Sequence, residues 1–144
     1  MTTLVLIEAG VDGVTKGSLE CLNAARSFLD GHFVLTRALA DSGHYPAIDV
    51  EQSISRVMIN VTHDRHRLLA RKLKSLWSRY QASRDLLAVG AYVPGSDPET
   101  DQAIALQPAM AALLQQDVRE RASIAESRAR LESLIGPVLD GPPR

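Results

Sequence analysis

The feature that most constrains the fold is a change of hydrophobic pattern near residue 60. Before it, short apolar runs are separated by turns that contain glycine. After it, apolar residues recur at steps of three, four and seven, which places them on one face of a long helix; they are Leu69, Leu73, Leu76, Tyr80 and Leu87. We therefore predict an α/β portion over residues 1–60, an all-helical domain over residues 61–138, and a disordered tail over residues 139–144.

Within the first portion, branched apolar runs predict two short buried strands, at residues 4–7 and 32–35. Helical spacing predicts a helix over residues 18–29 and a shorter one over residues 36–42 that Gly43 ends. The alternation of strand and helix favours an α/β layer.

In the second portion, the long helix is expected to begin with Thr62 or Asp64 as its cap. Two prolines and a glycine within residues 91–98 break the helical pattern, which resumes over residues 99–116. Pro108 is expected to kink or divide that segment. A last amphipathic helix is predicted over residues 119–134.

Composition excludes several classes of protein. The net charge of −1 gives no general attraction to nucleic acid or to an anionic membrane. Cys21 is the sole cysteine, so neither an intrachain disulfide nor a cysteine-built metal site is expected. The apolar run at residues 4–7 is too short to span a bilayer and has no signal-peptide pattern, so we expect a cytoplasmic protein.

Three stretches carry a family resemblance. Residues 30–37 (Asp-Gly-His-Phe-Val-Leu-Thr-Arg) are followed by residues 43–57, which contain Gly-His-Tyr-Pro-Ala-Ile-Asp-Val and Ser-Ile-Ser-Arg-Val. Together they resemble the flagellar and type III secretion protein-export ATPases, which are related to rotary ATP synthase head subunits. Residues 80–98, with Gly-Ala-Tyr and Gly-Ser-Asp-Pro, are similar to the C-terminal domain of that family and favour its flagellar branch over the injectisome branch.

The resemblance implies a remnant of a RecA-like nucleotide-binding core followed by a helical C-terminal domain. It implies a hexameric ring, ATP with Mg²⁺ as cofactor, and three kinds of partner: an export stalk protein, chaperones and exported substrates. No nucleic-acid partner is implied, and the ring would lie peripherally at the inner-membrane export gate. The family's phosphate-binding loop and metal-binding acids, the Walker A and Walker B regions, lie upstream of the matching stretch, so we predict that this chain alone neither binds ATP tightly nor hydrolyses it.

Two residues are candidates for a site. Arg56 offers the planar donors that match phosphoryl oxygens, and the resemblance implies that it is an arginine finger acting on a neighbouring subunit; an ordinary surface arginine is the alternative. Tyr45 precedes Pro46, which biases it towards an extended conformation. The resemblance implies that its ring forms one wall of an adenine pocket, whereas a core-packing tyrosine is the alternative.

Other patterns are weaker. Residues 10–18 distantly resemble a phosphate-binding loop around Lys16, but Thr15 and Gly17 occupy positions where that loop needs glycine and Ser or Thr, so we predict an ordinary loop. His63 and His66 lack an evident third metal ligand. Asp49 and Glu51 are expected to be structural.

A basic segment supports a second hypothesis. Seven cationic residues occur without an acid between residues 65 and 84; they are Arg65, Arg67, Arg71, Lys72, Lys74, Arg79 and Arg84. A solvated helix face is the plainer interpretation, and a docking face for an export chaperone or stalk protein is the alternative. The chain could thus be a non-catalytic interaction module, or a truncated product without independent function.

Overall fold

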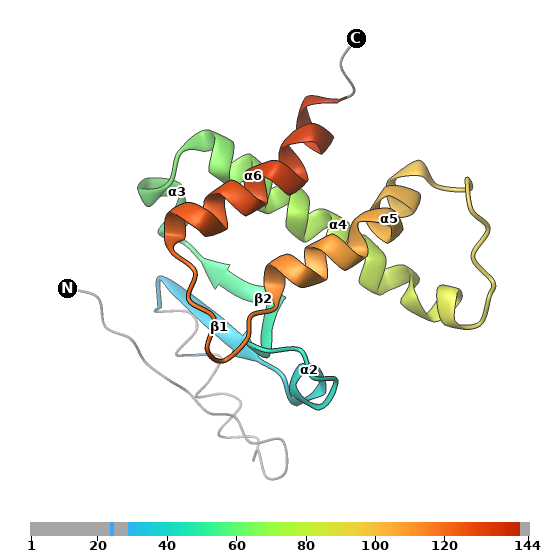
Figure 1. Ribbon diagram of the computed structural model, residues 1–144, viewed down its shortest axis with the longest axis horizontal. Coiled ribbons are helices and arrows are strands. Elements are labelled where there is room, and N and C mark those ends of the chain that lie inside the picture. The colour runs from blue at the N-terminus through green and yellow to red at the C-terminus, as the bar shows by residue number, and fades with distance from the viewer. Residues whose placement is uncertain (1–23, 25–28, 142–144) are drawn as a thin grey trace.

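The computed structural model describes Ala24 and residues 29–141 (Figure 1). Seven elements follow one another there: β1 (Gly31–Leu35), α2 (Arg37–Asp41), β2 (Ile48–Ser55), α3 (Met58–Val61), α4 (Asp64–Ala88), α5 (Pro98–Leu114) and α6 (Ile124–Asp140). The strand expected at residues 4–7, the loop at residues 10–18 and Cys21 lie outside the described residues, as does most of the helix expected at residues 18–29. The predicted strand at residues 32–35 and the short helix after it are confirmed as β1 and α2.

The strands β1 and β2 form a two-stranded antiparallel sheet. Its register is interrupted, because His32 pairs with Ile54 while Val34 pairs with Asp49. The extra residues of β2 form a turn in which the Asp49 carboxylate accepts the backbone N–H groups of Glu51 and Gln52, at 2.9 and 3.0 Å. Asp49 therefore has the structural role expected of it, since it satisfies backbone donors that the interrupted ladder leaves unpaired.

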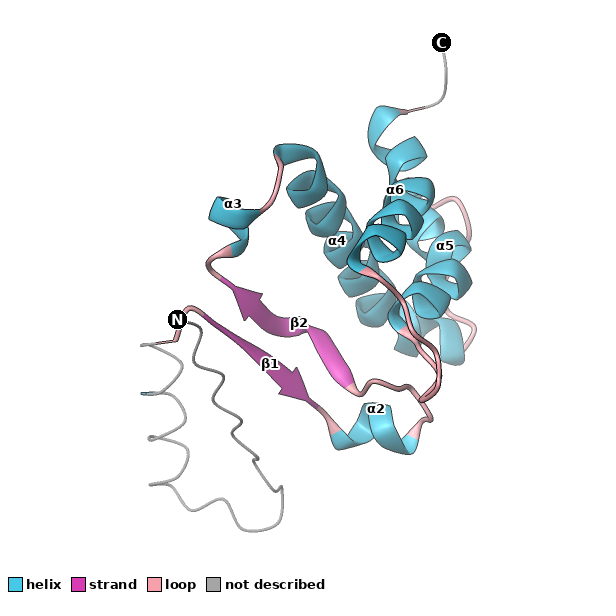
Figure 2. Ribbon diagram, turned by 60° about the vertical axis from the view of Figure 1, so that its left-hand side comes forward, coloured by secondary structure: helices cyan, strands magenta, loops and turns pink. Residues whose placement is uncertain are grey.

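The three long helices pack into one layer beside the sheet (Figure 2). The α5 helix folds back along the second half of α4, and α6 lies against the first half of α4 and beside the end of α5 (Figure 1). Seven buried apolar residues form the core, all of them on these helices: Leu69, Leu76, Trp77, Ala103, Met110, Leu131 and Ile135. The apolar face predicted for the long helix is thus the face that packs, and the fold is the expected strand-containing remnant followed by a helical domain.

The helices differ from expectation in three places. His63 occupies the N-cap position of α4 without a side-chain cap, and Thr62 instead donates its hydroxyl to the Met58 carbonyl at 2.6 Å. Pro108 lies inside α5, so of the two outcomes expected there, a kink or a division, the division is wrong. The last helix begins at Ile124, later than residue 119, because Ser123 and Glu126 form a capping box there.

The end of α6 reaches into the segment assigned to the tail. Asp140 is the last residue of the helix and accepts two hydrogen bonds from Arg65 of α4, each 2.7 Å long. Leu139 packs against the core. Residues 142–144 lie outside the described part of the chain.

Candidate functional site

Tyr45 lies in the connection between α2 and β2. Its side chain is 53% exposed, so the ring is presented to solvent instead of being packed in the core. Its backbone is held, because the Tyr45 carbonyl accepts the N–H of Gln116 at 2.8 Å. The Tyr45–Pro46 peptide bond is cis. The exposed ring is therefore available for stacking, and the backbone that carries it is held in place.

Arg56 follows the last residue of β2. Arg56 is exposed, and its backbone N–H donates to the carbonyl of Asp30 at 2.7 Å. This bond extends the β1–β2 pairing by one step beyond Ser55, which pairs with Gly31. The backbone of Arg56 is therefore fixed at the end of β2 by this pairing.

The two candidate residues lie beyond opposite ends of β2. Ile48 pairs with Leu35 and Ser55 pairs with Gly31, so the ends of β2 are separated by the length of β1. At about 3.3 Å per residue, four steps along β1 give about 13 Å. The structure does not bring Tyr45 and Arg56 together.

The helical domain contributes residues beside Tyr45 that the sequence did not indicate. The connection between α5 and α6 lies beside the segment that precedes β2, as both ribbon views show (Figures 1 and 2). Gln116 bonds the Tyr45 backbone there, and Nε2 of Gln115 lies 3.3 Å from Nδ1 of His44. These contacts join residues 71 positions apart, so no local pattern could have predicted them.

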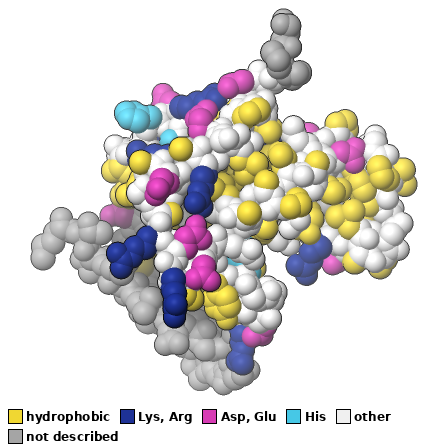
Figure 3. Space-filling model, viewed as in Figure 1, with side chains coloured by type: hydrophobic (Ala, Val, Ile, Leu, Met, Phe, Trp, Pro, Cys, Tyr) yellow, Lys and Arg dark blue, Asp and Glu magenta, His cyan; other side chains and the backbone are white. Residues whose placement is uncertain are grey.

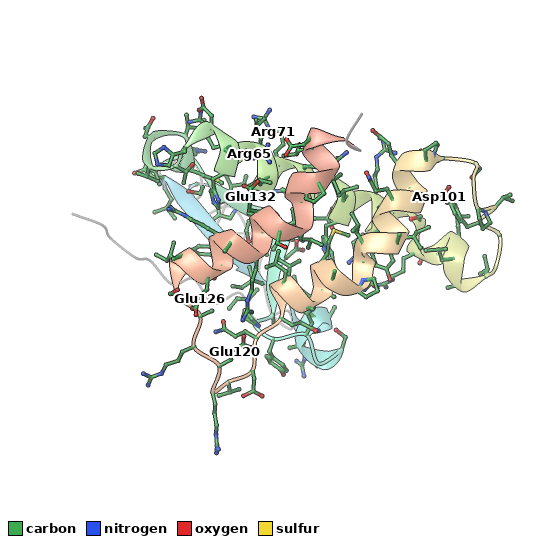
Figure 4. The ribbon with its side chains drawn as sticks, turned by 45° about the horizontal axis from the view of Figure 1, so that its top comes forward. Arg65, Arg71, Asp101, Glu120, Glu126 and Glu132 are labelled. Carbon is green, nitrogen blue, oxygen red and sulfur yellow. The ribbon has the colours of Figure 1, made fainter. Side chains whose placement is uncertain are left out.

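The basic segment is divided among several partners and does not form one cationic face. Arg65 bonds Glu132 and Asp140 of α6 (Figure 4), and Arg79 pairs with Asp97 and Glu99 at the start of α5. Other cations are used locally: Arg67 bonds Asp64 and the Ile59 carbonyl, and Lys74 donates to the Ser53 carbonyl at 3.2 Å. On the face shown in Figure 3, Lys and Arg side chains alternate with Asp and Glu.

Hydrogen bonds shift the pKa values of several residues in these contacts. The bond from Arg65, with its positive charge, lowers the pKa of Asp140, and the bonds to Asp140 and Glu132 raise the pKa of Arg65. The pKa of Asp97 is lowered chiefly by the hydroxyl of Thr100, which donates to it at 2.6 Å. These shifts accompany contacts between helices and do not mark a reacting group.

A shallow hollow of about 430 Å³ lies where α4 turns into α5, with Leu86, Val93 and Thr100 in its lining. Tyr92 also lines it and donates its hydroxyl to Asp101 at 2.8 Å. Burial, followed by this bond, raises the pKa of Tyr92, so the phenol stays protonated. The hollow offers mainly apolar contact.

The described residues fit only part of the cofactor that the resemblance implies. Tyr45 offers a ring face for a base, and Arg56 offers donors for a phosphoryl oxygen. Within residues 29–141 no group of three His, Cys, Asp or Glu side chains could hold a metal ion, so His63 and His66 have no third ligand there. No helix in the described part of the chain is long and apolar enough to cross a membrane.

Comparison with known proteins gives the class of protein first. Residues 2–55 match the nucleotide-binding domain of the ATP synthase alpha/beta family, and residues 62–133 match the T3SS EscN ATPase C-terminal domain. The second match covers half of the chain and coincides with α4, α5 and most of α6. The fold and both matches place the chain in the ATP synthase alpha/beta class, with a remnant of the nucleotide-binding domain followed by a helical C-terminal domain.

Individual relatives define the family. The flagellum-specific ATP synthase of Pseudomonas aeruginosa is 62% identical over 113 residues, which are 78% of this chain and 25% of that protein. The assembled ATPase EscN of the enteropathogenic E. coli type III secretion system superposes with a TM-score of 0.75 at 38% identity, over 78% of this chain and 27% of that one. EscN in complex with its central stalk EscO gives the same TM-score and identity, over 28% of its chain. This chain belongs to the family of flagellar and type III secretion export ATPases, and it spans about a quarter of the length of these relatives.

Proposed function

We propose that this chain is the C-terminal segment of an ATPase that powers flagellar or type III protein export. It completes nucleotide sites in a hexameric ring by supplying an arginine finger and part of an adenine pocket. The observation that carries the proposal is the placement of two exposed side chains, Tyr45 and Arg56, beyond opposite ends of β2 in a chain of this family.

Arg56 is the arginine finger in this proposal. Its planar guanidinium can bond two oxygens of a phosphoryl group at once. Charge that builds on those oxygens during transfer is then stabilised by a donor whose backbone is already fixed. In this proposal the finger acts on the nucleotide site of a neighbouring subunit.

Tyr45 forms one wall of the adenine pocket. A stacked base would cover a ring that is 53% exposed, and stacking on an aromatic ring stabilises a bound base by about 1–3 kcal/mol. ATP with Mg²⁺ is the cofactor of the ring, and its phosphates and metal are held by groups outside residues 29–141. We place the boundary between the core and the helical domain near residue 60, between the two family matches. The ring works in the cytoplasm, peripheral to the inner-membrane export gate, where it meets chaperones and exported substrates.

The experiment that tests the finger uses the P. aeruginosa relative as the partner subunit. The residue of that relative that aligns with Arg56 is replaced by alanine, and ATP hydrolysis is measured as this chain is added. Wild-type chain is expected to raise the hydrolysis rate by about 10-fold or more, because removal of one preorganised donor costs about 100- to 1,000-fold in turnover and mixed rings recover part of that loss. Arg56→Ala chain is expected to give no increase, and Arg56→Lys chain only a small one, because an ammonium lacks the planar fork.

Arg37→Ala is the matched control. Arg37 is also an exposed arginine beside the sheet, but its contact is with Asp41 on its own helix. This variant should raise hydrolysis as far as wild-type chain does. Equal stimulation by wild-type and Arg56→Ala chains would refute the proposed finger, and hydrolysis by the isolated chain that Arg56→Ala abolishes would show that it carries a complete site.

A second candidate function is a docking module for an export stalk protein. It is favoured by the likeness to EscN, whose complex with the stalk EscO has been solved, and by Arg71 and Arg84, two exposed α4 cations outside the contacts described above. Lys74 is a poor test residue because it bonds the Ser53 carbonyl. Binding of a stalk protein to wild-type chain and to the Arg71→Glu/Arg84→Glu variant separates the possibilities: equal binding would remove these cations from the interface.

A further inference from the structure

His44 is a buried polar residue that the proposed function does not use. It is 8% exposed and lies between α4 and the end of α5. Its ring centroid is 6.3 Å from that of Trp77, at an angle of 54°. A buried imidazole costs free energy unless its nitrogens are hydrogen-bonded.

That hydrogen bond comes from the helical domain. Nε2 of Gln115, the C-cap residue that follows α5, lies 3.3 Å from Nδ1 of His44. A side-chain amide nitrogen can only donate, so Nδ1 of the histidine accepts in this arrangement. The imidazole thus contacts the C-cap residue of α5 and one residue of α4, both far from it in sequence.

Tyr45 is the next residue along the chain, and its backbone is held on both sides. Before it, the N–H of His44 donates to the Leu39 carbonyl at 2.9 Å. On Tyr45 itself, the carbonyl accepts the N–H of Gln116 at 2.8 Å. Gln115 and Gln116 therefore hold two successive residues, the first through its side chain and the second through its backbone.

We propose that His44 is a positioning residue, through which the end of α5 and Trp77 of α4 set the position of the Tyr45 ring. A displacement of α5 relative to the sheet would move His44 and would carry Tyr45 with it. This proposal rests on the proposed function only for its consequence: if Tyr45 is an adenine wall, base binding and the arrangement of the helical domain are coupled in both directions.

The test follows Tyr45 in the full chain without any nucleotide. The chain has three tyrosines, so 3-fluorotyrosine incorporation gives three ¹⁹F resonances that Tyr→Phe variants assign. Gln115→Ala removes the amide that holds His44, and it should shift or broaden the Tyr45 resonance. The Tyr92 resonance should stay in place, because Tyr92 lies at the far end of α4, in the turn that leads to α5.

Gln116→Ala is the matched control. Its side chain bonds the Glu120 carbonyl at 2.8 Å, while the backbone N–H that bonds Tyr45 survives the substitution. Its Tyr45 resonance should coincide with that of wild type. Thermal unfolding followed by circular dichroism checks that both variants are folded, and Gln115 is exposed, so its loss leaves the core intact.

Two results would overturn the proposal: a Tyr45 resonance that Gln115→Ala leaves in place, or one that Gln116→Ala moves as far as Gln115→Ala does. Because the samples contain no nucleotide, the outcome does not depend on whether Tyr45 binds adenine. The ring assay with Arg56→Ala tests the proposed function separately.

Discussion

Replacing Ile135 by alanine is expected to destabilise the helical domain by about 2–5 kcal/mol. Ile135 has no exposed surface and belongs to α6, whose buried residues are Leu131, Ile135 and Gly136. The substitution deletes about three methylene-sized groups at about 0.8 kcal/mol each, and the cavity left behind adds to that loss. Ile135→Val deletes one group and should cost about 0.5–1.5 kcal/mol.

The assay is unfolding of the chain in urea or by heat, followed by circular dichroism of its helices. In a domain of about 60–100 residues, about 1 kcal/mol lowers Tm by about 4–8 °C, so a loss of about 3 kcal/mol lowers it by about 12–24 °C. Ile124→Ala is the matched control, since Ile124 begins the same helix and is 75% exposed. If the two alanine variants lost the same stability, the packing of α6 described above would be wrong.

Three further predictions concern glycines and acids. Gly31→Ala should disrupt the sheet, because the new Cβ would lie 2.6 Å from a backbone oxygen of β2, and amide exchange of β1 and β2 should quicken. Gly136→Ala should leave stability unchanged or raise it by up to about 1 kcal/mol, because helix propensity improves and the nearest atom, 2.8 Å away, ends the flexible Glu132 side chain; an unfolding curve decides the sign. Acid should destabilise the fold, because Asp97 and Asp140 have folded-state pKa values below the ordinary 3.8. Their contribution is present above pH 3.8 and is lost as pH falls through the lowered values, so the Asp97→Asn/Asp140→Asn variant should show a shallower loss of stability.

The sequence was sufficient for elements whose signals are local. The apolar repeat of α4 determined both the helix and the face that packs, and Gly43, with φ of 75°, follows the end of α2 as expected. The start of the last helix was misplaced although its signal was present. Ser123 and Glu126 have the spacing of a capping box, and that spacing is a better guide than the helix-favouring residues before it.

Contacts between distant segments were not predictable in the same way. Arg65 and Glu132 are 67 positions apart, so a count of cations along α4 could not show that α6 supplies their partners. The same holds for His44 and Gln115, which meet only after α5 has folded back along α4. For Tyr45 and Arg56, the resemblance implied the roles, and the structure adds that both are exposed and that they lie beyond opposite ends of β2.

The strand β2 is held by the helical domain near each of its ends. Gln116 bonds the backbone of Tyr45 just before the strand, and Lys74 of α4 bonds the Ser53 carbonyl near its end. A rigid movement of the helices would therefore act on the segments that carry Tyr45 and Arg56 together. If Arg56 serves the site of a neighbouring subunit, as we propose, and Tyr45 serves the site of its own subunit, the helical domain connects neighbouring sites of a ring mechanically. Loosening either contact should then weaken that connection without removing a residue that touches the nucleotide.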